Sequence, residues 1–344
     1  MPELFVTNYN ARFTGVSATA GNVLRQQVKR FDVALVGQAL PGCPTPLSRK
    51  AAHQHSMRPP IDRPFSIWHV RRNPEMRSAL WLRDVRGVPI KIVFTSAAQR
   101  LHSLYPRWLI SRMDAVIATS RKAASFVPNT SAIVPHGVDT EVFAPAEDRN
   151  AAWTALGFGG KRGIASIGRI RPEKGTDIFV DAMLRFLPDH PETVGLVLGR
   201  ATPPYRPFLN KLKAKVIAAG LGDRLLFPGE ISAEKLPSIV RALSLIVHLP
   251  RYEGYGMTPL EGLSAGVPFV ATDTGYYRSF SADGQVGAIV PTQAEAAAKA
   301  VQDLLNRPVD FGAAARAVAL ERFSIKGEAD GISAVYDALW RGDI

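Results

Sequence analysis

Short apolar runs alternate with amphipathic stretches along almost the whole chain. Each run has four to six residues rich in Val, Ile, Leu and Phe, which is the pattern of a strand buried on both faces of a parallel sheet. The predicted strands are residues 4–8, 31–36, 67–70, 91–95, 115–119, 163–168, 194–198, 225–230, 245–249 and 269–272. Helical periodicity separates most of them, so the sequence predicts repeated β-α units and an α/β fold.

The strand and helix alternation is interrupted once, by a polar connector near residues 145–150. A chain of 344 residues also exceeds what one ordinary core accommodates. We therefore expect a first domain at 1–148, a second at 149–325 and a terminal helix within 326–344.

The stretch from residue 39 to residue 65 is basic, rich in proline and without clear periodicity. It is predicted to be a long loop, and loops of this length are usually functional or mobile. Its two histidines, His53 and His55, have no cysteine or carboxylate partners at metal-ligand spacing, so we expect both to be solvated.

Composition limits where the protein acts. The single cysteine, Cys43, excludes an internal disulfide and fits a reducing compartment. No apolar run approaches the roughly 18 residues needed to span a bilayer. The N-terminus also lacks the basic start and long apolar stretch of a signal peptide. These features predict a cytoplasmic protein.

The net charge of +12 is concentrated in the first half of the chain. Residues 1–150 hold 20 Lys and Arg against 10 Asp and Glu, whereas residues 151–344 hold 22 against 20. Such a balance indicates an anionic partner, which can be nucleic acid, an anionic membrane surface or an acidic acceptor. Nucleic acid is not expected, because the basic residues are not interleaved with aromatics and match no known binding module.

The clearest chemical pattern lies in residues 251–268, directly after the predicted strand 245–249. Thr258 is predicted to cap a short helix, and Gly266 to end it after about two turns. The N-terminus of a helix offers unpaired backbone N–H groups and a positive dipole end. The stretch therefore predicts a phosphate site.

Two carboxylates flank this predicted phosphate site, Glu253 in the loop and Glu261 on the first helical turn. Phosphate and carboxylates together indicate a ligand with both phosphate and hydroxyl groups, such as a nucleotide sugar. A structural interpretation stays open from spacing alone. Glu261 lies three residues after Thr258 and would complete a capping box, and Glu253 would be a solvated loop residue.

Glu253 and Glu261, with seven residues between them, resemble the E-x7-E signature of retaining GT-B glycosyltransferases, in particular glycosyltransferase family 4. The run 247–273 is similar to that family's donor-site block, and the turn 168–175 to its Gly-Arg-x-x-x-x-Lys-Gly element. The resemblance covers nearly the whole chain. It implies two Rossmann-like domains facing across a cleft, with the C-terminal helix crossing back to the first domain.

The resemblance also implies roles for individual residues. The donor-binding set is Gly15, Arg169, Lys174, Gly229, Glu230, Glu253, Gly254, Tyr255, Gly256, Met257, Thr258 and Glu261. The catalytic set is Glu253, Arg169, Lys174 and His69, and the acceptor-binding set is Arg71, Arg72 and Asn73. In these sets, Arg169 and Lys174 would neutralise the donor diphosphate. No Asp-x-Asp motif is present, so we expect no metal and no cofactor beyond the donor substrate.

Within this family, four stretches are similar to lipopolysaccharide-core mannosyltransferases: residues 6–10, 14–17, 68–73 and 94–99. That similarity implies transfer of mannose from GDP-mannose to Kdo on lipid A by an enzyme peripheral on the cytoplasmic face of the inner membrane. Another donor such as UDP-glucose, or a nucleotide-sugar 2-epimerase of the same architecture, remains an alternative. A dinucleotide-dependent dehydrogenase is disfavoured, because neither domain has Gly-x-Gly-x-x-Gly after its first strand.

Two segments depart from the family pattern. Many relatives carry a histidine just after the strand that corresponds to 91–95, where this chain has Ser96-Ala-Ala. After the strand 269–272 relatives continue with a glycine pair and a glutamate, whereas here the chain reads Gly275-Tyr-Tyr-Arg. We expect the second departure to alter contacts with the donor sugar.

Overall fold

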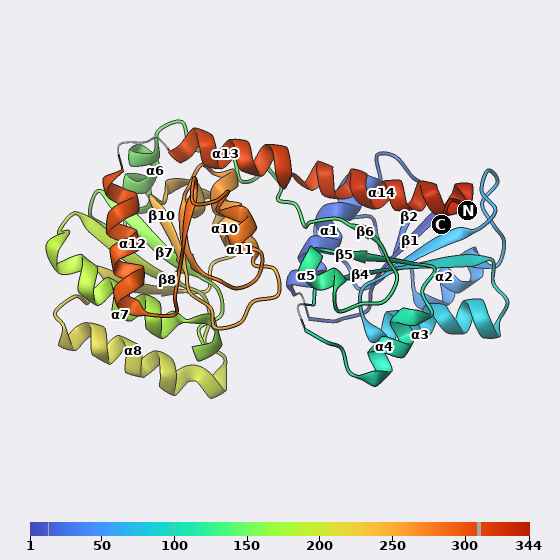
Figure 1. The fold of residues 1–344 in the computed structure, drawn as a ribbon, viewed down its shortest axis with the longest axis horizontal. Coiled ribbons are helices and arrows are strands. Elements are labelled where there is room, and N and C mark those ends of the chain that lie inside the picture. Colours follow the sequence, from blue (N-terminus) through green and yellow to red (C-terminus); the bar gives the residue numbers. More distant parts are fainter. Residues whose placement is uncertain (13, 99, 308–310) are drawn as a thin grey trace. The chain divides into compact units, whose positions relative to one another are not determined.

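The computed structural model describes residues 1–12, 14–98, 100–307 and 311–344 and divides into two compact units. The first unit comprises Met1–Gly137 and Phe323–Ile344, and the second Val138–Arg322. Each unit is built on its own six-stranded parallel sheet (Figure 1). Gln99, part of one of the stretches that resemble the mannosyltransferases, lies outside the described residues.

The first unit carries α-helices on both faces of its sheet. The strands are β1 Leu4–Asn8, β2 Val33–Gly37, β3 Ser66–Val70, β4 Ile90–Ser96, β5 Ala115–Ala118 and β6 Thr130–Ile133. The α-helices are α1 Gly15–Gln27, α2 Arg49–Ser56, α3 Asn73–Leu80, α4 Leu104–Ser111, α5 Arg121–Ala124 and α14 Ile325–Arg341. In space the strands run β2-β1-β3-β4-β5-β6, so the chain returns to the other side of β1 when it forms β3.

The second unit repeats this plan. The strands are β7 Arg162–Ile167, β8 Thr193–Leu198, β9 Leu225–Gly229, β10 Leu245–His248, β11 Phe269–Thr272 and β12 Gly287–Val290. The α-helices are α6 Arg149–Leu156, α7 Thr176–Phe186, α8 Arg206–Ala218, α9 Leu236–Ala242, α10 Met257–Ser264, α11 Tyr277–Phe280, α12 Ala294–Asn306 and α13 Phe311–Arg322. The spatial order β12-β11-β10-β7-β8-β9 shows that the chain returns to the other side of β7 when it forms β10.

Alternation along β1 shows how the first core is divided. Leu4 and Val6 belong to a cluster completed by α1 and α14, whereas Phe5 belongs to a second cluster with Trp68 of β3. Successive side chains of a strand point to opposite faces, so a strand buried on both faces must be apolar at every position. This is why the buried strands read as continuous apolar runs in the sequence.

The contacts set the unit boundary at Gly137 rather than at the expected residue 148. Residues 138–148 pack with the second unit, where the Ser264 hydroxyl donates to the Phe143 carbonyl at 2.9 Å. Arg316 donates to the Thr140 carbonyl at 2.7 Å. The connector is thus fixed to α10 and α13, which a polar composition does not reveal.

The terminal helix α14 belongs to the first unit, and one buried carboxylate fastens its start there. Glu328 accepts a hydrogen bond from the backbone N–H of Gly137 at 2.7 Å and lies 2.7 Å from His136 Nδ1. A Cβ on Gly137 would come within 2.3 Å of the Ser324 carbonyl. Only glycine therefore allows the helix to begin this close to the chain at residue 137.

All ten predicted strands are present, with ends that shift by up to two residues. The expectation of an irregular loop at 39–65 is wrong in its middle, because α2 forms there between the prolines. His53 on α2 is not solvated either, since its ring packs between Trp68 at 5.9 Å and Trp81 at 6.1 Å. His55 is exposed. Among the described residues, no helix is both long and apolar enough to cross a bilayer.

We expect Glu328→Ala to lower the free energy of unfolding by about 2–4 kcal/mol, because it leaves the buried Gly137 N–H without this acceptor and removes the carboxylate hydrogen-bonded to His136. The control is Asp330→Ala, which removes an exposed ion pair with Lys326 on the same helix and should change stability by less than about 1 kcal/mol. Denaturant unfolding measures both. Equal effects of the two substitutions would contradict the anchoring role of Glu328.

Candidate functional site

The two loops predicted to hold the donor lie at the point where the strand order of the second sheet reverses. β7 is followed by β8 and β9 on one side, and β10 returns to its other side. Loops leaving neighbouring parallel strands in opposite directions open a crevice at the carboxyl ends, where ligands bind in open α/β sheets. The loop after β7 carries Arg169 and Lys174, and the loop after β10 carries Glu253.

Two ion pairs and one backbone hydrogen bond join these loops. Lys174 Nζ lies 2.5 Å from Glu253 Oε2. The guanidinium of Arg251 donates to the Asp177 carboxylate at 2.7 and 2.9 Å, and its backbone N–H donates to the Glu173 carbonyl at 2.9 Å. Only Asp177 lies in a strand or α-helix, and the other four residues do not. The contacts between the two loops therefore determine the path of the backbone in both.

Glu253 is a half-buried carboxylate with a compensating cation. Burial alone would raise the pKa of its carboxyl group, but the Lys174 ammonium group and its hydrogen bond hold that pKa below the usual value. The backbone N–H of Gly254 donates to Oε1 at 3.0 Å. Glu253 is therefore ionised at neutral pH and cannot act as a proton donor there.

His248, which the sequence analysis did not single out, ends β10 and interacts electrostatically with both members of this pair. Its Nδ1 is 2.5 Å from the hydroxyl of Tyr277. Burial lowers the pKa of His248 to about 4 and raises that of Tyr277 well above its usual value, so both are neutral. In the sequence, His248 could have been noticed as the one polar residue in the apolar run 245–249.

The loop enters α10 through a glycine, not through the predicted threonine cap. Gly256 is the N-cap residue with a φ of 94°, and α10 begins at Met257, which places Thr258 inside the first turn. A Cβ on Gly256 would lie 2.2 Å from the ring of Tyr277. The expectation of a Thr258 cap is wrong because the left-handed turn at Gly256 starts the helix earlier.

Of the two tyrosines in this loop, Tyr252 is exposed and Tyr255 is buried. Its ring stacks on Tyr276 with 5.1 Å between centroids, and its carbonyl accepts the Tyr276 N–H at 2.9 Å. The segment that departs from the family pattern after β11 therefore packs beneath the predicted donor loop and shapes it.

The predicted capping box at Glu261 is also absent, because Thr258 is not the cap. Glu261 forms no ion pair with a described residue, and burial raises the pKa of its carboxyl group to about 7. The two carboxylates of the E-x7-E pattern thus differ in kind. Glu253 has its charge compensated, whereas Glu261 is half-buried without a cation and would gain from hydroxyl donors supplied by a ligand.

Three further predicted donor residues of the second unit, Arg169, Gly229 and Glu230, follow or end strands at the same edge of its sheet. Arg169 is exposed immediately after β7. Gly229 ends β9 with a φ of 94°, and the exposed Glu230 lies 3.5 Å from Arg200. In the sheet, β10 lies on one side of β7, and β8 and then β9 lie on the other. Glu253 follows β10 and Glu230 follows β9, so the two residues lie on opposite sides of β7.

In the first unit the predicted acceptor residues separate into different environments. Arg72 Nη1 donates to Asn8 and Glu75 at 3.2 and 3.1 Å, and its Nη2 donates to Thr14 and Ser17 at 3.1 and 3.0 Å. Its guanidinium group is therefore occupied in holding the β1–α1 loop. Asn73 and Gly15 are exposed first residues of α3 and α1.

His69 lies in the core of the first unit with 0% exposure. Its Nε2 is 2.7 Å from the Thr95 hydroxyl, and its Nδ1 is bonded to the hydroxyl of Tyr336 on α14. Burial, with the nearby charge of Arg71, lowers the pKa of His69 well below its usual value. The arrangement favours a positioning role for this neutral histidine over proton transfer.

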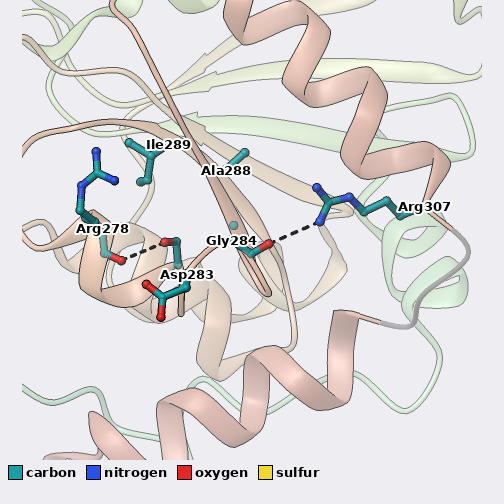
Figure 2. A pocket seen from close by; sticks show the side chains of 8 residues that line it. Arg278, Asp283, Gly284, Ala288, Ile289 and Arg307 are labelled. Carbon is teal, nitrogen blue, oxygen red and sulfur yellow. Dashed lines mark hydrogen bonds between the residues drawn. The ribbon is translucent and has the colours of Figure 1, made fainter.

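Arg71 lines a cavity of about 290 Å³ formed entirely by residues of the first unit. A larger hollow of about 470 Å³ lies beside β12 in the second unit, between Arg278 and Arg307 (Figure 2). None of the predicted site residues lines that hollow, and Arg278 is paired with Asp273 at 2.6 Å. Across the described part of the chain, no group of three or more His, Cys, Asp or Glu side chains is arranged to hold a metal ion.

The chain is similar to known glycosyltransferases. The family of group 1 glycosyl transferases matches residues 153–318. The chain is 39% identical to the lipopolysaccharide core biosynthesis mannosyltransferase LpcC of Rhizobium leguminosarum bv. viciae, over 98% of this chain and 96% of that protein. It is 40% identical to the lipopolysaccharide core biosynthesis mannosyltransferase LpsB of Rhizobium meliloti, over 98% of each.

Solved structures with little sequence identity share the fold. Anabaena HepE in complex with UDP aligns with a TM-score of 0.82 at 15% identity, covering 98% of this chain and 100% of that one. Sucrose-phosphate synthase from Thermosynechococcus elongatus aligns with a TM-score of 0.78 at 18% identity, covering 98% and 99%.

The chain therefore belongs to the group 1 glycosyltransferases and has the GT-B fold. It is an enzyme, and over nearly its whole length it is similar to the lipopolysaccharide core mannosyltransferases. The expectations of a glycosyltransferase, of similarity to lipopolysaccharide-core mannosyltransferases and of the GT-B fold are thereby confirmed.

We expect Glu261→Gln to stabilise the protein at pH 8, by up to about 3 kcal/mol. A carboxyl group with a pKa of about 7 in the folded state and its ordinary value in the unfolded state makes the folded protein bind more protons between these values. Wild-type stability should thus fall as pH rises from about 4.5 to 7. The gain of the variant should disappear near pH 4.5.

Unfolding across a pH series measures this effect, and Glu295→Gln, at an exposed position on α12, is the control. A Glu261→Gln variant whose stability is lower than that of the wild type at pH 8 would show that the carboxylate is needed by the fold itself.

Proposed function

We propose that this glycosyltransferase moves a hexose, with retention of configuration, from a nucleoside diphosphate sugar to a lipopolysaccharide inner-core acceptor. The best candidate donor is GDP-mannose and the best candidate acceptor is Kdo attached to lipid A. The observation that carries the proposal is the near full-length similarity to two proteins named as lipopolysaccharide core mannosyltransferases. The Lys174–Glu253 pair at the strand-order reversal of the second unit supports it independently.

The proposed chemistry follows from the charges at that reversal. Breaking the glycosidic bond leaves negative charge on the diphosphate, which the Lys174 ammonium, the Arg169 guanidinium and the N-terminus of α10 would stabilise. When Lys174 pairs with a bound diphosphate instead of with Glu253, the Glu253 carboxylate can accept hydrogen bonds from hexose hydroxyls. Glu261 would accept from the ribose hydroxyls.

No side chain is assigned as the base. Of the predicted catalytic residues, Glu253 and His69 are the two that could accept a proton. The lowered pKa of Glu253 makes it a weak base, and His69 is fully buried with both ring nitrogens hydrogen-bonded. The proposal therefore assigns the acceptor proton to an oxygen of the leaving diphosphate, with attack on the same face. No metal ion takes part.

The basic first half of the chain supports peripheral attachment to the cytoplasmic face of the inner membrane, where an anionic lipid-linked acceptor would lie. Positively charged side chains near an anionic bilayer contribute about 1 kcal/mol each, and salt weakens the attraction within a Debye length of about 8 Å at physiological ionic strength. Use of an acceptor carried in anionic vesicles should therefore fall as salt is added.

Release of free nucleotide from a donor panel tests the function. We expect GDP release from GDP-mannose only when vesicles carrying Kdo-lipid A are present, unchanged by EDTA and weaker at high salt. Calorimetry with GDP-mannose and UDP-glucose identifies the donor that binds more tightly. An epimerised sugar without any acceptor would establish the 2-epimerase alternative instead, and activity lost with EDTA would overturn metal independence.

We expect Lys174→Ala to reduce kcat more than it weakens donor binding, because charge accumulates on the diphosphate only as the bond breaks. Loss of an interaction with a charged group corresponds to roughly 1.5–3 kcal/mol. Steady-state kinetics and calorimetry separate the two effects. Lys161→Ala is the control, since the ammonium group of that lysine forms an exposed ion pair with Glu192. Equal losses in kcat and in affinity would make Lys174 a binding residue only.

A further inference from the structure

The cavity of about 290 Å³ in the first unit lies at the carboxyl ends of β3 and β4, beside the first turn of α1. Its volume is at the lower end of small-molecule sites, which hold roughly 300–1,000 Å³. Val16 and Phe94 supply an apolar wall, and Arg71, Ser96 and His102 supply polar groups. Ser96 and His102 were not among the residues expected from the sequence.

Three polar atoms of this lining are buried and lack a hydrogen-bond partner in the described part of the chain. They are Nη1 of Arg71, Oγ of Ser96 and Nε2 of His102. Ser96 itself is only 2% exposed. Buried polar groups in native proteins are almost always satisfied, because leaving one unpaired costs folding free energy. Three such atoms around one cavity indicate a ligand that accepts hydrogen bonds.

The carboxylates nearest to Arg71 are already engaged elsewhere. Glu75 binds the Arg72 guanidinium at 3.1 Å and the backbone N–H groups of Tyr9 and Arg71. Glu328 binds His136 and Gly137. Burial lowers the pKa of the Arg71 guanidinium more than these carboxylates raise it, so its charge is incompletely compensated within the unit.

We propose that this cavity binds the carboxylate of a sugar acid through the Arg71 guanidinium, the Ser96 hydroxyl and the His102 imidazole N–H. The inference rests on the proposed function and names the part of the acceptor that the enzyme recognises. A guanidinium fork matches the two oxygens of a carboxylate. The serine hydroxyl and the imidazole supply the further donors.

The charge of the site favours a carboxylate over a phosphate. Burial, together with Arg100, lowers the pKa of His102, so its imidazole is neutral at physiological pH and, of the three proposed donors, only Arg71 carries a charge. Glu75 and Glu328 reduce the positive potential there further. A phosphate monoester carries about −1.5 to −2 charges at pH 7, whereas a carboxylate carries one, which one guanidinium can balance.

The test compares two acceptors with the full-length enzyme, Kdo-lipid A and the same glycolipid with its carboxyl group converted to a methyl ester. We expect the ester to raise the acceptor KM about tenfold or more, the factor for losing one charge-assisted hydrogen bond. Arg71→Gln, Ser96→Ala and His102→Gln should each raise the KM for the acid form similarly, but leave the KM for the ester almost unchanged. Donor affinity should stay constant.

Ser103→Ala and His55→Gln are the controls, because they change the same residue types at exposed positions outside the cavity. Thermal unfolding of every variant establishes that it is folded. Ser96→Ala removes one oxygen only and keeps the test decisive if Arg71→Gln does not fold. Variants that lose the same factor with acid and ester acceptors would overturn the assignment, as would equal use of both acceptors by the wild type.

Direct binding separates this inference from the proposed function. We expect free Kdo to bind the wild-type protein in saturation-transfer NMR and to lose that binding in Ser96→Ala. If this holds while Kdo-lipid A is not a substrate, the cavity assignment stands and the proposed acceptor fails. If transfer to Kdo-lipid A occurs but Kdo binding does not depend on Ser96, the cavity assignment fails and the function stands. Displacement of Kdo by equimolar inorganic phosphate would contradict the preference for a carboxylate.

Discussion

The return of the chain to the other side of its first strand decides where chemistry can occur in each unit. In parallel sheets all carboxyl ends share one edge, so loops diverge only where the strand order reverses. In the second unit the reversal at β7 and β10 brings Lys174 to Glu253. In the first unit the chain reverses between β1 and β3, and Arg71, which directly follows β3, lines the cavity.

Near these reversals, some buried charged side chains are paired within the protein and others are not. Glu253 has a cation and a backbone donor, and the Arg72 guanidinium is satisfied by four neighbours. In the described part of the chain, Glu261 has no cation to pair with, and Nη1 of the partly compensated Arg71 guanidinium has no hydrogen-bond partner. Uncompensated groups weaken the folded state but gain most from a ligand, and functional sites are where such groups persist.

Sequence reasoning succeeded wherever a strand is buried on both faces, because only then does every position have to be apolar. It missed β6 and β12, whose residues are partly exposed edge positions, and α2, which lies between prolines. The signature glutamates and the Lys174 turn were found from their pattern. The Gly256 cap and the His248–Tyr277 contact were not, since both depend on the ring of Tyr277, which follows His248 in the chain by 29 residues. Ser96 and His102 carry no motif, and only the packing of three elements around them makes them a set.

The position of α14 in the chain also constrains how the protein folds during synthesis. Residues 138–322 form the second unit as one continuous segment, so that unit can complete its core as soon as α13 has left the ribosome. The first unit is made earlier but lacks Tyr336 and Trp340, which complete one face of its sheet, until the last helix emerges. Domains generally fold as units in the order of their synthesis. Here the second unit can complete its core before the first. The apolar surface that α14 covers stays exposed on the nascent chain while the whole second unit is synthesised.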